Sequence, residues 1–464
     1  MRDAEHVEPA GDLLPQGLAS DVERVSGARI IAVRPRGGGG ASREGAELRL
    51  AWPDGREEQA YMNYDVHKAG AGDDAAFLRE ASVLAALSGP LEGSGVCTAR
   101  FIAALPDRRA LIASQVAGDA NFRRLQGNER MTVAADFMGQ LAMLHRIDVT
   151  ARPVEGMGPL RPIADTVAER IAAIRARNRA ADDDPLLNLT LDWLEANVPA
   201  EPERLVIVHG DAGPGNFLFA DGKVTALLDW ELVHYGDPMA DLAMICLRML
   251  IQPFVPLGEV FASYRAAGGF PIDIPRIRFW RLFFQVGFAG RSSRFTDPAA
   301  PPPPNLGMNM VYSMIHRRVL AEAAAEAMGV ALEPVEMPDA PEGPRWRSYQ
   351  IALDDLRDAI VPHVADQRAA AKAKGLARLV KWWRDIERYE AAFHAAELRE
   401  LSTALATPFH SVHDGRDALA SKVSAHSIDP VVALRLCHAQ TARESALMAD
   451  AMGALAKSTF EPLI

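Results

Sequence analysis

The chain of 464 residues is poor in cysteine, in net positive charge and in long apolar runs. Its three cysteines, Cys97, Cys246 and Cys437, are too far apart in sequence for a typical metal site or disulfide framework. The formal net charge of −11 argues against a nucleic-acid partner, because phosphate contacts need a basic face. The most apolar window, LAMICLRMLIQPFVPLG, is interrupted by Arg248 and two prolines, so it is too short to cross a bilayer. The N-terminus has early acids and no apolar run typical of a signal peptide. We therefore expect a cytoplasmic protein without a membrane or nucleic-acid partner.

Strand and helix signals change along the chain in a clear order. Residues 28–66 read as a meander of strands, with a Pro-Asp-Gly turn that is typical of a hairpin. Residues 73–89 carry apolar side chains at helical spacing, and two short strands follow within 96–118. Beyond these strands the pattern is mainly helical, apart from the strands around residues 205–236. The order predicts an α+β protein with a cleft between a strand-rich lobe and a helix-rich lobe.

The length predicts two or three domains, and proline-rich stretches indicate where they divide. The segment LEPVEMPDAPEGP is polar, acidic and regularly interrupted by proline, which is typical of a linker. The helices after it would form an additional all-helical domain. The predicted segments are an N-terminal extension (1–27), a strand-rich N-lobe (28–118), a helix-rich C-lobe (119–331), a linker (332–344) and a C-terminal helical domain (345–464).

Acidic and amide side chains stand at the ends of apolar strands in residues 205–243. Asp211 and Asn216 lie five positions apart across a glycine-rich loop, and Asp229 ends the next apolar strand. Phosphoryl transfer from a nucleotide requires a carboxylate that accepts the proton of the acceptor hydroxyl. It also requires oxygen ligands for Mg²⁺, which takes only one or two from the protein. The inventory of this stretch therefore predicts a phosphoryl-transfer site.

The sequences HGDAGPGNF, LLDWE and GDPMADLA together resemble the phosphotransferase family that includes aminoglycoside phosphotransferases and choline kinases. The likeness is greatest to the kinase-like domains associated with acyl-CoA dehydrogenases. The resemblance implies a two-lobed protein-kinase-like fold that uses ATP and Mg²⁺. It implies that Asp211 is the catalytic base and that Asn216 and Asp229 are metal ligands. It also makes His209 a structural residue and puts Glu231 near the second metal or the substrate.

Some residues of the same motifs are better explained by structure than by chemistry. Asp237 precedes a proline and a helix, so we expect it to cap that helix. We expect Asp241 to cap a helix or to make internal hydrogen bonds. His145 matches a position of the family at a helix end, where we also expect a structural role.

The resemblance implies a nucleotide site in the N-lobe. The stretch RGGGGASREGAEL puts four glycines between two strands, as a loop that covers phosphates requires, although a flexible hairpin would look the same. Glu80 resembles the helix glutamate that pairs with a strand lysine or arginine in this family. The adenine-binding hinge falls between Ser114 and Gly118. The residues implied in nucleotide binding are Gly39, Gly40, Ser42, Lys68, Glu80, Ser114, Gln115 and Val116.

The chain departs from the family in its third strand. No lysine or arginine lies between Arg56 and Lys68, where the family has a cation for the α and β phosphates. Met62, Asn63 or Tyr64 would occupy that position. Glu80 then needs another cation, and the candidates are Lys68 at the end of the strand, or Arg36 or Arg43 from the glycine-rich loop.

We expect an ATP- and Mg²⁺-dependent kinase that phosphorylates a hydroxyl of a small metabolite. A set of arginines follows the motif, and a solvated helix face is the simpler explanation for it than an anionic substrate such as an acyl-CoA. The alternative to an enzyme is a nucleotide-binding pseudokinase that acts as a regulatory or interaction module. The chain lacks the His-Arg-Asp, Asp-Phe-Gly and Ala-Pro-Glu signatures of protein kinases. A homodimer could form through the C-terminal helices. The arginines are Arg278, Arg281, Arg291, Arg294, Arg317 and Arg318.

Overall fold

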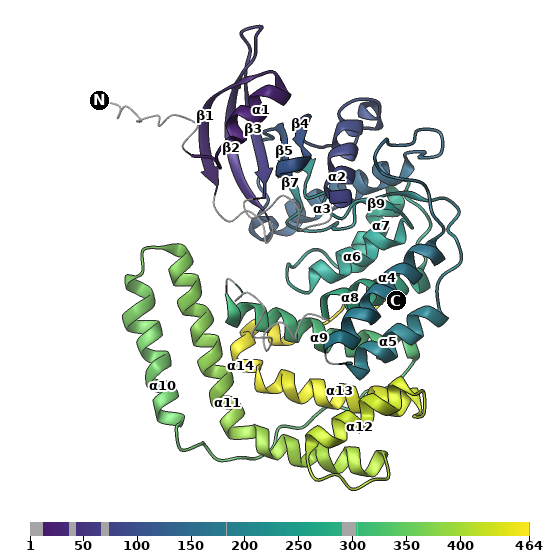
Figure 1. Ribbon diagram of the computed structural model, residues 1–464, viewed down its shortest axis with the longest axis vertical. Coiled ribbons are helices and arrows are strands. Elements are labelled where there is room, and N and C mark those ends of the chain that lie inside the picture. The colour runs from purple at the N-terminus through teal and green to yellow at the C-terminus, as the bar shows by residue number, and fades with distance from the viewer. Residues whose placement is uncertain are drawn as a thin grey trace. The chain divides into compact units, whose positions relative to one another are not determined.

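The computed structural model describes residues 13–36, 43–65, 74–181, 183–289, 303 and 305–463. These residues divide into two compact units, and each unit combines two separate stretches of the chain. Unit 1 combines residues 1–161 with 202–273, and unit 2 combines residues 162–201 with 274–464. Every strand within the described residues lies in unit 1, and unit 2 is helical there (Figure 1). The predicted α+β class with an all-helical C-terminal region is therefore confirmed.

Unit 1 begins with strands and continues with helices that alternate with short strands. The order follows the sequence pattern, with α2 and α3 where apolar residues recur at helical spacing. Its elements are α1 (Leu18–Ser26), β1 (Arg29–Arg36), β2 (Glu44–Ala51), β3 (Glu57–Tyr64), α2 (Asp74–Leu87), β4 (Phe101–Leu105), β5 (Ala110–Ser114), α3 (Gly127–Arg146), β6 (Val206–Val208), β7 (Phe217–Ala220), β8 (Lys223–Leu227), β9 (His234–Gly236), α6 (Met239–Met249) and α7 (Leu257–Ala266).

The main sheet of unit 1 runs β1-β2-β3-β5-β4 within the described part of the chain, and neighbouring strands are antiparallel. The predicted Pro-Asp-Gly turn joins β2 to β3. The N–H of Trp52 donates a 2.8 Å hydrogen bond to the carbonyl of Arg56 across it, and Gly55 has φ +85°. That backbone conformation favours glycine, which explains why the turn signal was readable from the sequence.

One face of this sheet packs against α1. Met62 and Tyr64 of β3 are at most 3% exposed and share a core cluster with Leu18 of α1. Successive side chains of a strand point to opposite faces, so Asn63 lies on the other face. Met62 and Tyr64 therefore belong to the apolar core. Of the three residues considered for the position of the missing cation, Asn63 alone points away from the apolar core.

Two small sheets carry the motif loops. β6 pairs with β9, and β7 pairs with β8. Thr98 forms an isolated bridge to Leu227, and Asp119 forms another to Phe219. The first bridge joins β8 to the segment before β4, and the second joins β7 to the segment that follows β5, so the hinge lies beside the β7–β8 pair.

Unit 2 is built from helices that come from the middle and from the end of the chain. Asp429 caps one of them by accepting a 2.7 Å bond from the N–H of Val431, as the Asp-Pro pair predicts. Its helices are α4 (Ile163–Ala181), α5 (Pro185–Ala196), α8 (Ile274–Ala289), α9 (Leu306–Met328), α10 (Trp346–Asp354), α11 (Gln367–Ala404), α12 (Val412–Ser424), α13 (Pro430–Leu447) and α14 (Ala449–Met452).

The two units divide the chain differently from the segments predicted from sequence. Residues 330–343 have no regular secondary structure, in keeping with the composition of the predicted linker. However, α13 packs against α5 and α9, and α12 also packs against α5. The helices on either side of the proline-rich segment therefore share one core in unit 2.

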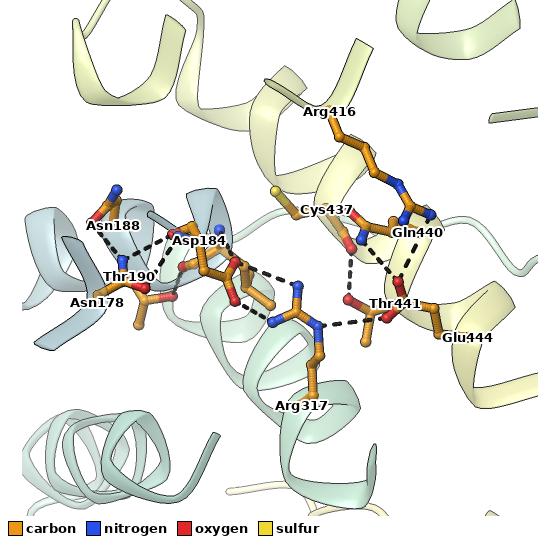
Figure 2. Close-up of polar contacts among 11 residues, drawn as sticks. Asn178, Asp184, Asn188, Thr190, Arg317, Arg416, Cys437, Gln440, Thr441 and Glu444 are labelled. Atoms are coloured by element: carbon orange, nitrogen blue, oxygen red, sulfur yellow. Dashed lines mark hydrogen bonds and ion pairs between the residues drawn. The ribbon is translucent and has the colours of Figure 1, made fainter. Parts of the chain in front are cut away.

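A buried ionic network joins three of these helices (Figure 2). Arg317 of α9 forms an ion pair with Asp184, the residue that caps α5, and lies 3.7 Å from a carboxylate oxygen of Glu444 on α13. Burial alone would lower the pKa of Arg317, but the two carboxylates raise it. The guanidinium therefore stays charged, and loss of the Asp184 pair would leave it with only the longer contact to Glu444.

The arginines that follow the motif do not form a solvated face. Arg281 is 1% exposed and pairs with Glu326, and Arg278 lies 3.4 Å from the same carboxyl group. Arg318 lies 3.4 Å from Glu322 within α9. These side chains, like Arg317, neutralise acids of unit 2, so the expectation of a solvated face is wrong. Arg291 and Arg294 lie outside the described residues.

No helix in the described residues is both long enough and apolar enough to cross a membrane.

Candidate active site

The loop between β6 and β7 is held by a buried carboxylate from α6. The two oxygens of Asp241 accept hydrogen bonds from the backbone N–H groups of His209 and Gly210, each at 2.8 Å. The His145 ring lies 3.0 Å from the same carboxylate and 2.7 Å from the Tyr264 hydroxyl. Burial would raise the pKa of Asp241, but His145 and these donors lower it. The structural roles predicted for Asp241 and His145 are confirmed.

Asp237 has the role predicted for it at the start of α6. Its Oδ1 accepts a 2.9 Å hydrogen bond from the N–H of Met239, and the side chain is buried. It therefore caps the helix that carries Asp241.

His209 connects the two loops that carry the candidate site residues. The N–H of Asp211 lies 3.3 Å from His209 Nδ1, and His209 Nε2 lies 2.9 Å from the carbonyl of Leu228. Burial lowers the pKa of His209, so the ring is neutral, with its proton on Nε2 to serve the carbonyl. The N–H of Leu228 also donates a 2.9 Å bond to the carbonyl of Asn216. These contacts fix the residue next to Leu228, Asp229, against the loop of Asp211.

Asp211 and Asn216 are hydrogen-bonded to each other across the loop. The Asn216 Nδ2 group donates to Asp211 Oδ2 at 2.6 Å and to the Asp211 carbonyl at 2.9 Å. The amide oxygen Oδ1 instead accepts a 3.1 Å hydrogen bond from Arg248 Nη2. Arg248 Nη1 donates to both carboxylate oxygens of Asp211, at 2.6 and 2.7 Å. The pair that the sequence predicts is thus brought together, with an arginine added to it.

Asp229 has an unusual backbone and an unusual electrostatic environment. Its φ is +63°, a left-handed value that aspartate tolerates better than most residues and that often marks a functional position. Burial raises its pKa to about 7, and Glu231, Asp211 and Glu80 contribute in the same direction. No described residue donates a hydrogen bond to its carboxylate. The site thus gathers several carboxylates around Asp229, and Arg248 offsets part of their effect on its pKa.

This donor set fits a hard divalent cation. Mg²⁺ takes oxygen ligands and usually keeps several waters, so one amide oxygen and one carboxylate are enough protein ligands. Asn216 Oδ1 and the Asp229 carboxylate are oxygen groups of this kind. Within the described residues no group of three histidine, cysteine, aspartate or glutamate side chains is arranged to hold a metal, as a zinc site would require. The residues therefore fit Mg²⁺ and do not form a closed structural metal site.

Glu80 of α2 has a cation partner in the described chain, and that partner is Arg43. Arg43 Nη1 lies 2.6 Å from Glu80 Oε2, and the two side chains are 17% and 4% exposed. Burial raises the pKa of Glu80, whereas Arg43 lowers it. Arg36, the other arginine considered, instead pairs with Glu47 at 2.6 Å. Arg43, which pairs with Glu80, lies immediately before β2 and directly after the glycine-rich loop.

The hinge after β5 exposes backbone groups. The N–H of Gln115 donates a 2.9 Å bond to the carbonyl of Gln59, which closes the ladder with β3. In the described chain the N–H of Val116 has no hydrogen-bond partner. The N–H of Asp119 then returns to the carbonyl of Phe219 at 3.0 Å. The hinge thus presents a free backbone donor beside the motif strands, as an adenine-binding segment requires.

Four of the predicted nucleotide-binding residues, Gly39, Gly40, Ser42 and Lys68, lie outside the described residues. Glu231 lies close enough to raise the pKa of both Asp229 and Glu80. Arg248 was missed by sequence reasoning, where it counted only as a charge that interrupts an apolar window. A cation in the last turn of the helix that follows the motif, next to a glycine-rich loop, was the signal that could have found it.

Comparison with known proteins places the family match on this site. Residues 67–280 match the model of the phosphotransferase enzyme family. The chain is 28% identical over 170 residues to acyl-CoA dehydrogenase family member 10 of Mus musculus, covering 36% of this chain and 15% of that protein. It is 33% identical over 110 residues to acyl-CoA dehydrogenase family member 11 of Gallus gallus, covering 22% of this chain and 13% of that protein. The chain therefore spans less than a sixth of the length of these relatives. The predicted resemblance is confirmed.

A similar solved structure is macrolide 2′-phosphotransferase from Brachybacterium faecium. Its sequence is 19% identical, and the match covers 69% of this chain and 99% of that one with a TM-score of 0.45.

Proposed function

We propose, on the premise that residues 67–280 form a phosphotransferase-family domain, that this chain is a small-molecule kinase which transfers the γ-phosphate of ATP to a hydroxyl. The observation that carries the proposal is the joined arrangement of three side chains. Asp211 and Asn216 are hydrogen-bonded to each other, and Asp229 is held beside them through Leu228 and His209. Burial and the neighbouring carboxylates raise the pKa of the Asp229 carboxyl group to about 7.

The protein groups have distinct roles in this proposal. Asp211 Oδ1 or Oδ2 accepts the proton of the acceptor hydroxyl, and Asn216 Nδ2 orients that carboxylate. Asn216 Oδ1 and Asp229 hold Mg²⁺, which when bound would neutralise charge on the phosphates. The Val116 backbone contacts the adenine. The glycine-rich loop, with Gly39, Gly40 and Ser42, covers the phosphates.

A cation must balance the α and β phosphates, and we assign this role to Arg43. Its pairing with Glu80 reproduces, from the start of β2, the strand cation and helix glutamate of related kinases. Lys68 is the alternative that the sequence suggested, and comparing the two variants decides between them.

The acceptor is a hydroxyl of a small metabolite, and hydroxyacyl-CoA compounds are the first class to screen. The reason is that the matched relatives are acyl-CoA dehydrogenase family members. The arginines of unit 2 no longer support an anionic acceptor, because their described members are paired with acids. ADP release from MgATP, measured over a panel of hydroxyacyl-CoAs, sugars and amino alcohols, tests the proposal. The Asp211→Asn variant is the control for contaminating kinases. Absence of acceptor-dependent ADP release across the panel, together with absence of nucleotide binding, would refute it.

A second candidate is a nucleotide-binding pseudokinase that acts as a regulatory module. The observation in its favour is that Arg248 engages both oxygens of Asp211. Mg²⁺-dependent nucleotide binding without turnover of any acceptor would support this reading.

A further inference from the structure

Arg248, in the last turn of α6, contacts both halves of the candidate site. Its Nη1 donates to the two oxygens of Asp211, and its Nη2 donates to Asn216 Oδ1 at 3.1 Å. Its Nε donates to the carbonyl of Pro214 at 3.2 Å. One guanidinium thus binds the proposed base, the proposed metal ligand and the loop between them.

The position of Arg248 is built into the loop. Gly213 has φ +148°, and a Cβ at this residue would lie 2.8 Å from Cδ of Arg248. A side chain at residue 213 would therefore displace the arginine. Gln252, four residues after Arg248, packs against Gly215, where a Cβ would lie 2.8 Å from Oε1 of Gln252. Arg123 Nη2 fixes the intervening segment by donating a 2.6 Å bond to the carbonyl of Ile251.

This geometry creates a conflict over one oxygen. Asn216 Nδ2 is committed to Asp211, so the amide contributes Oδ1 to a metal, and Arg248 Nη2 already donates to Oδ1. Two cations on the same amide oxygen repel each other, and the repulsion is substantial where the site is partly buried. The Arg248 and Asp211 side chains are 20% and 16% exposed.

We infer that Arg248 is a positioning residue with two linked effects, an inference that rests on the proposed function. Through Nη1 it aligns the carboxylate of Asp211 for proton transfer. Through Nη2 it competes with Mg²⁺ for Asn216 Oδ1, so the metal binds less tightly than the carboxylates alone would allow. With Mg²⁺ bound, Arg248 Nη2 would give up its bond to the amide oxygen, while Nη1 would keep its two bonds to Asp211. Metal binding and alignment of the base are therefore coupled through one side chain.

The inference makes an opposite prediction for metal affinity and for turnover. Arg248→Met should lower the Mg²⁺ concentration for half-maximal stabilisation by ADP about three- to tenfold, because a competing charge is removed. Turnover at saturating Mg²⁺ should fall about tenfold or more, since the carboxylate of Asp211 loses its alignment. Arg248→Lys keeps the charge and should hold the wild-type Mg²⁺ midpoint while recovering part of the turnover. A purely structural arginine would lower both properties together.

The experiment measures thermal stabilisation of the full chain by ADP across a Mg²⁺ titration, alongside ADP release. Arg24→Met is the matched control, because Arg24 pairs with Asp21 on the surface of α1 and should leave both readouts unchanged. If Arg248→Met does not fold, Arg248→Gln removes the charge but keeps donors for Asp211, and it should show the same gain in Mg²⁺ affinity. Unchanged or weaker Mg²⁺ binding in the folded variant, with a normal wild type, overturns the inference alone. A wild type without Mg²⁺-dependent stabilisation overturns the proposed function and this inference with it.

Discussion

Replacing Arg43 by alanine should lower both the stability and the turnover of the protein. Both losses should exceed those caused by removing an exposed ion pair. Glu80 is 4% exposed and Arg43 is its partner at 2.6 Å. Removing one partner of a buried pair costs roughly 3–5 kcal/mol of folding free energy. We expect the lower end of that range, because Glu80 can take up a proton once Arg43 is gone. Loss of a preorganised cation from the phosphates should lower turnover by about 10²-fold or more.

The pH dependence of stability gives a separate check on this pair. Arg43 lowers the pKa of Glu80, whereas burial and Glu231 raise it. Without Arg43 the folded-state pKa rises further above the unfolded value, so the folded variant binds a proton that the unfolded chain does not. Stability is then gained as pH falls, and the deficit of Arg43→Ala should be smaller at pH 5 than at pH 8. Urea unfolding at the two pH values measures the difference.

The assay compares four variants for turnover and for stability: Arg43→Ala, Glu80→Ala, the double variant and Lys68→Ala. The losses of turnover from Arg43 and Glu80 should be non-additive, with a coupling of roughly 0.5–3 kcal/mol for a contacting pair. Arg36→Ala is the control, because that arginine is half exposed and its pair with Glu47 should be worth about 0–1 kcal/mol. Normal turnover in Arg43→Ala combined with a severe loss in Lys68→Ala would show that Lys68 serves the phosphates and would refute the assignment.

Three further outcomes follow from the same structure. Asp211→Asn keeps the shape of the base but removes its proton acceptor, so turnover should fall by about 10²–10⁴-fold while nucleotide still binds; an active variant would exclude Asp211 as the base. Asp229→Ala should abolish the Mg²⁺-dependent part of nucleotide stabilisation in a thermal-shift assay, because one of few protein ligands is lost; an unaltered Mg²⁺ response would count against this ligand. Limited proteolysis should cut first within 332–344, and the two fragments should stay together on native size exclusion, because α12 and α13 pack on α5 and α9; separate elution of a folded helical fragment would instead restore the independent C-terminal domain.

The core of the site was predictable because its residues are close in sequence and each follows from a local rule. Asp211 and Asn216 are separated by a loop that only glycines allow, and Asp229 ends an adjacent strand. Asp237 and Asp241 fall on a helix start, where capping and backbone bonding could be foreseen. His145 was found from its position at a helix end. Such features need no knowledge of which distant segments meet.

The cations of the site could not be placed by the same reasoning. Arg43 and Glu80 are 37 residues apart in sequence, and Arg248 and Asp211 are also 37 residues apart. Both contacts therefore depend on how distant segments pack. The role of Arg317 likewise depends on Asp184, which lies 133 residues away. Helical periodicity tells that an arginine lies on a face but not which acid faces it. This is why a solvated surface was expected where ion pairs form.

Unit 2 combines two stretches that are far apart in the chain, and this affects how it folds during synthesis. Ser424 Oγ donates a 3.1 Å bond to Asp183 Oδ2 across 241 residues, and Arg317 closes the network around Asp184. During synthesis at about 5–20 residues per second, the segment 162–201 leaves the ribosome roughly 12–48 seconds before its last partners exist. During that interval the helices that complete the core around α4 and α5 have not yet been made, so the apolar faces of α4 and α5 remain partly uncovered. The helical unit can therefore finish folding only after α13 has been made, and a product that stops before α13 would expose these faces to chaperones and proteases.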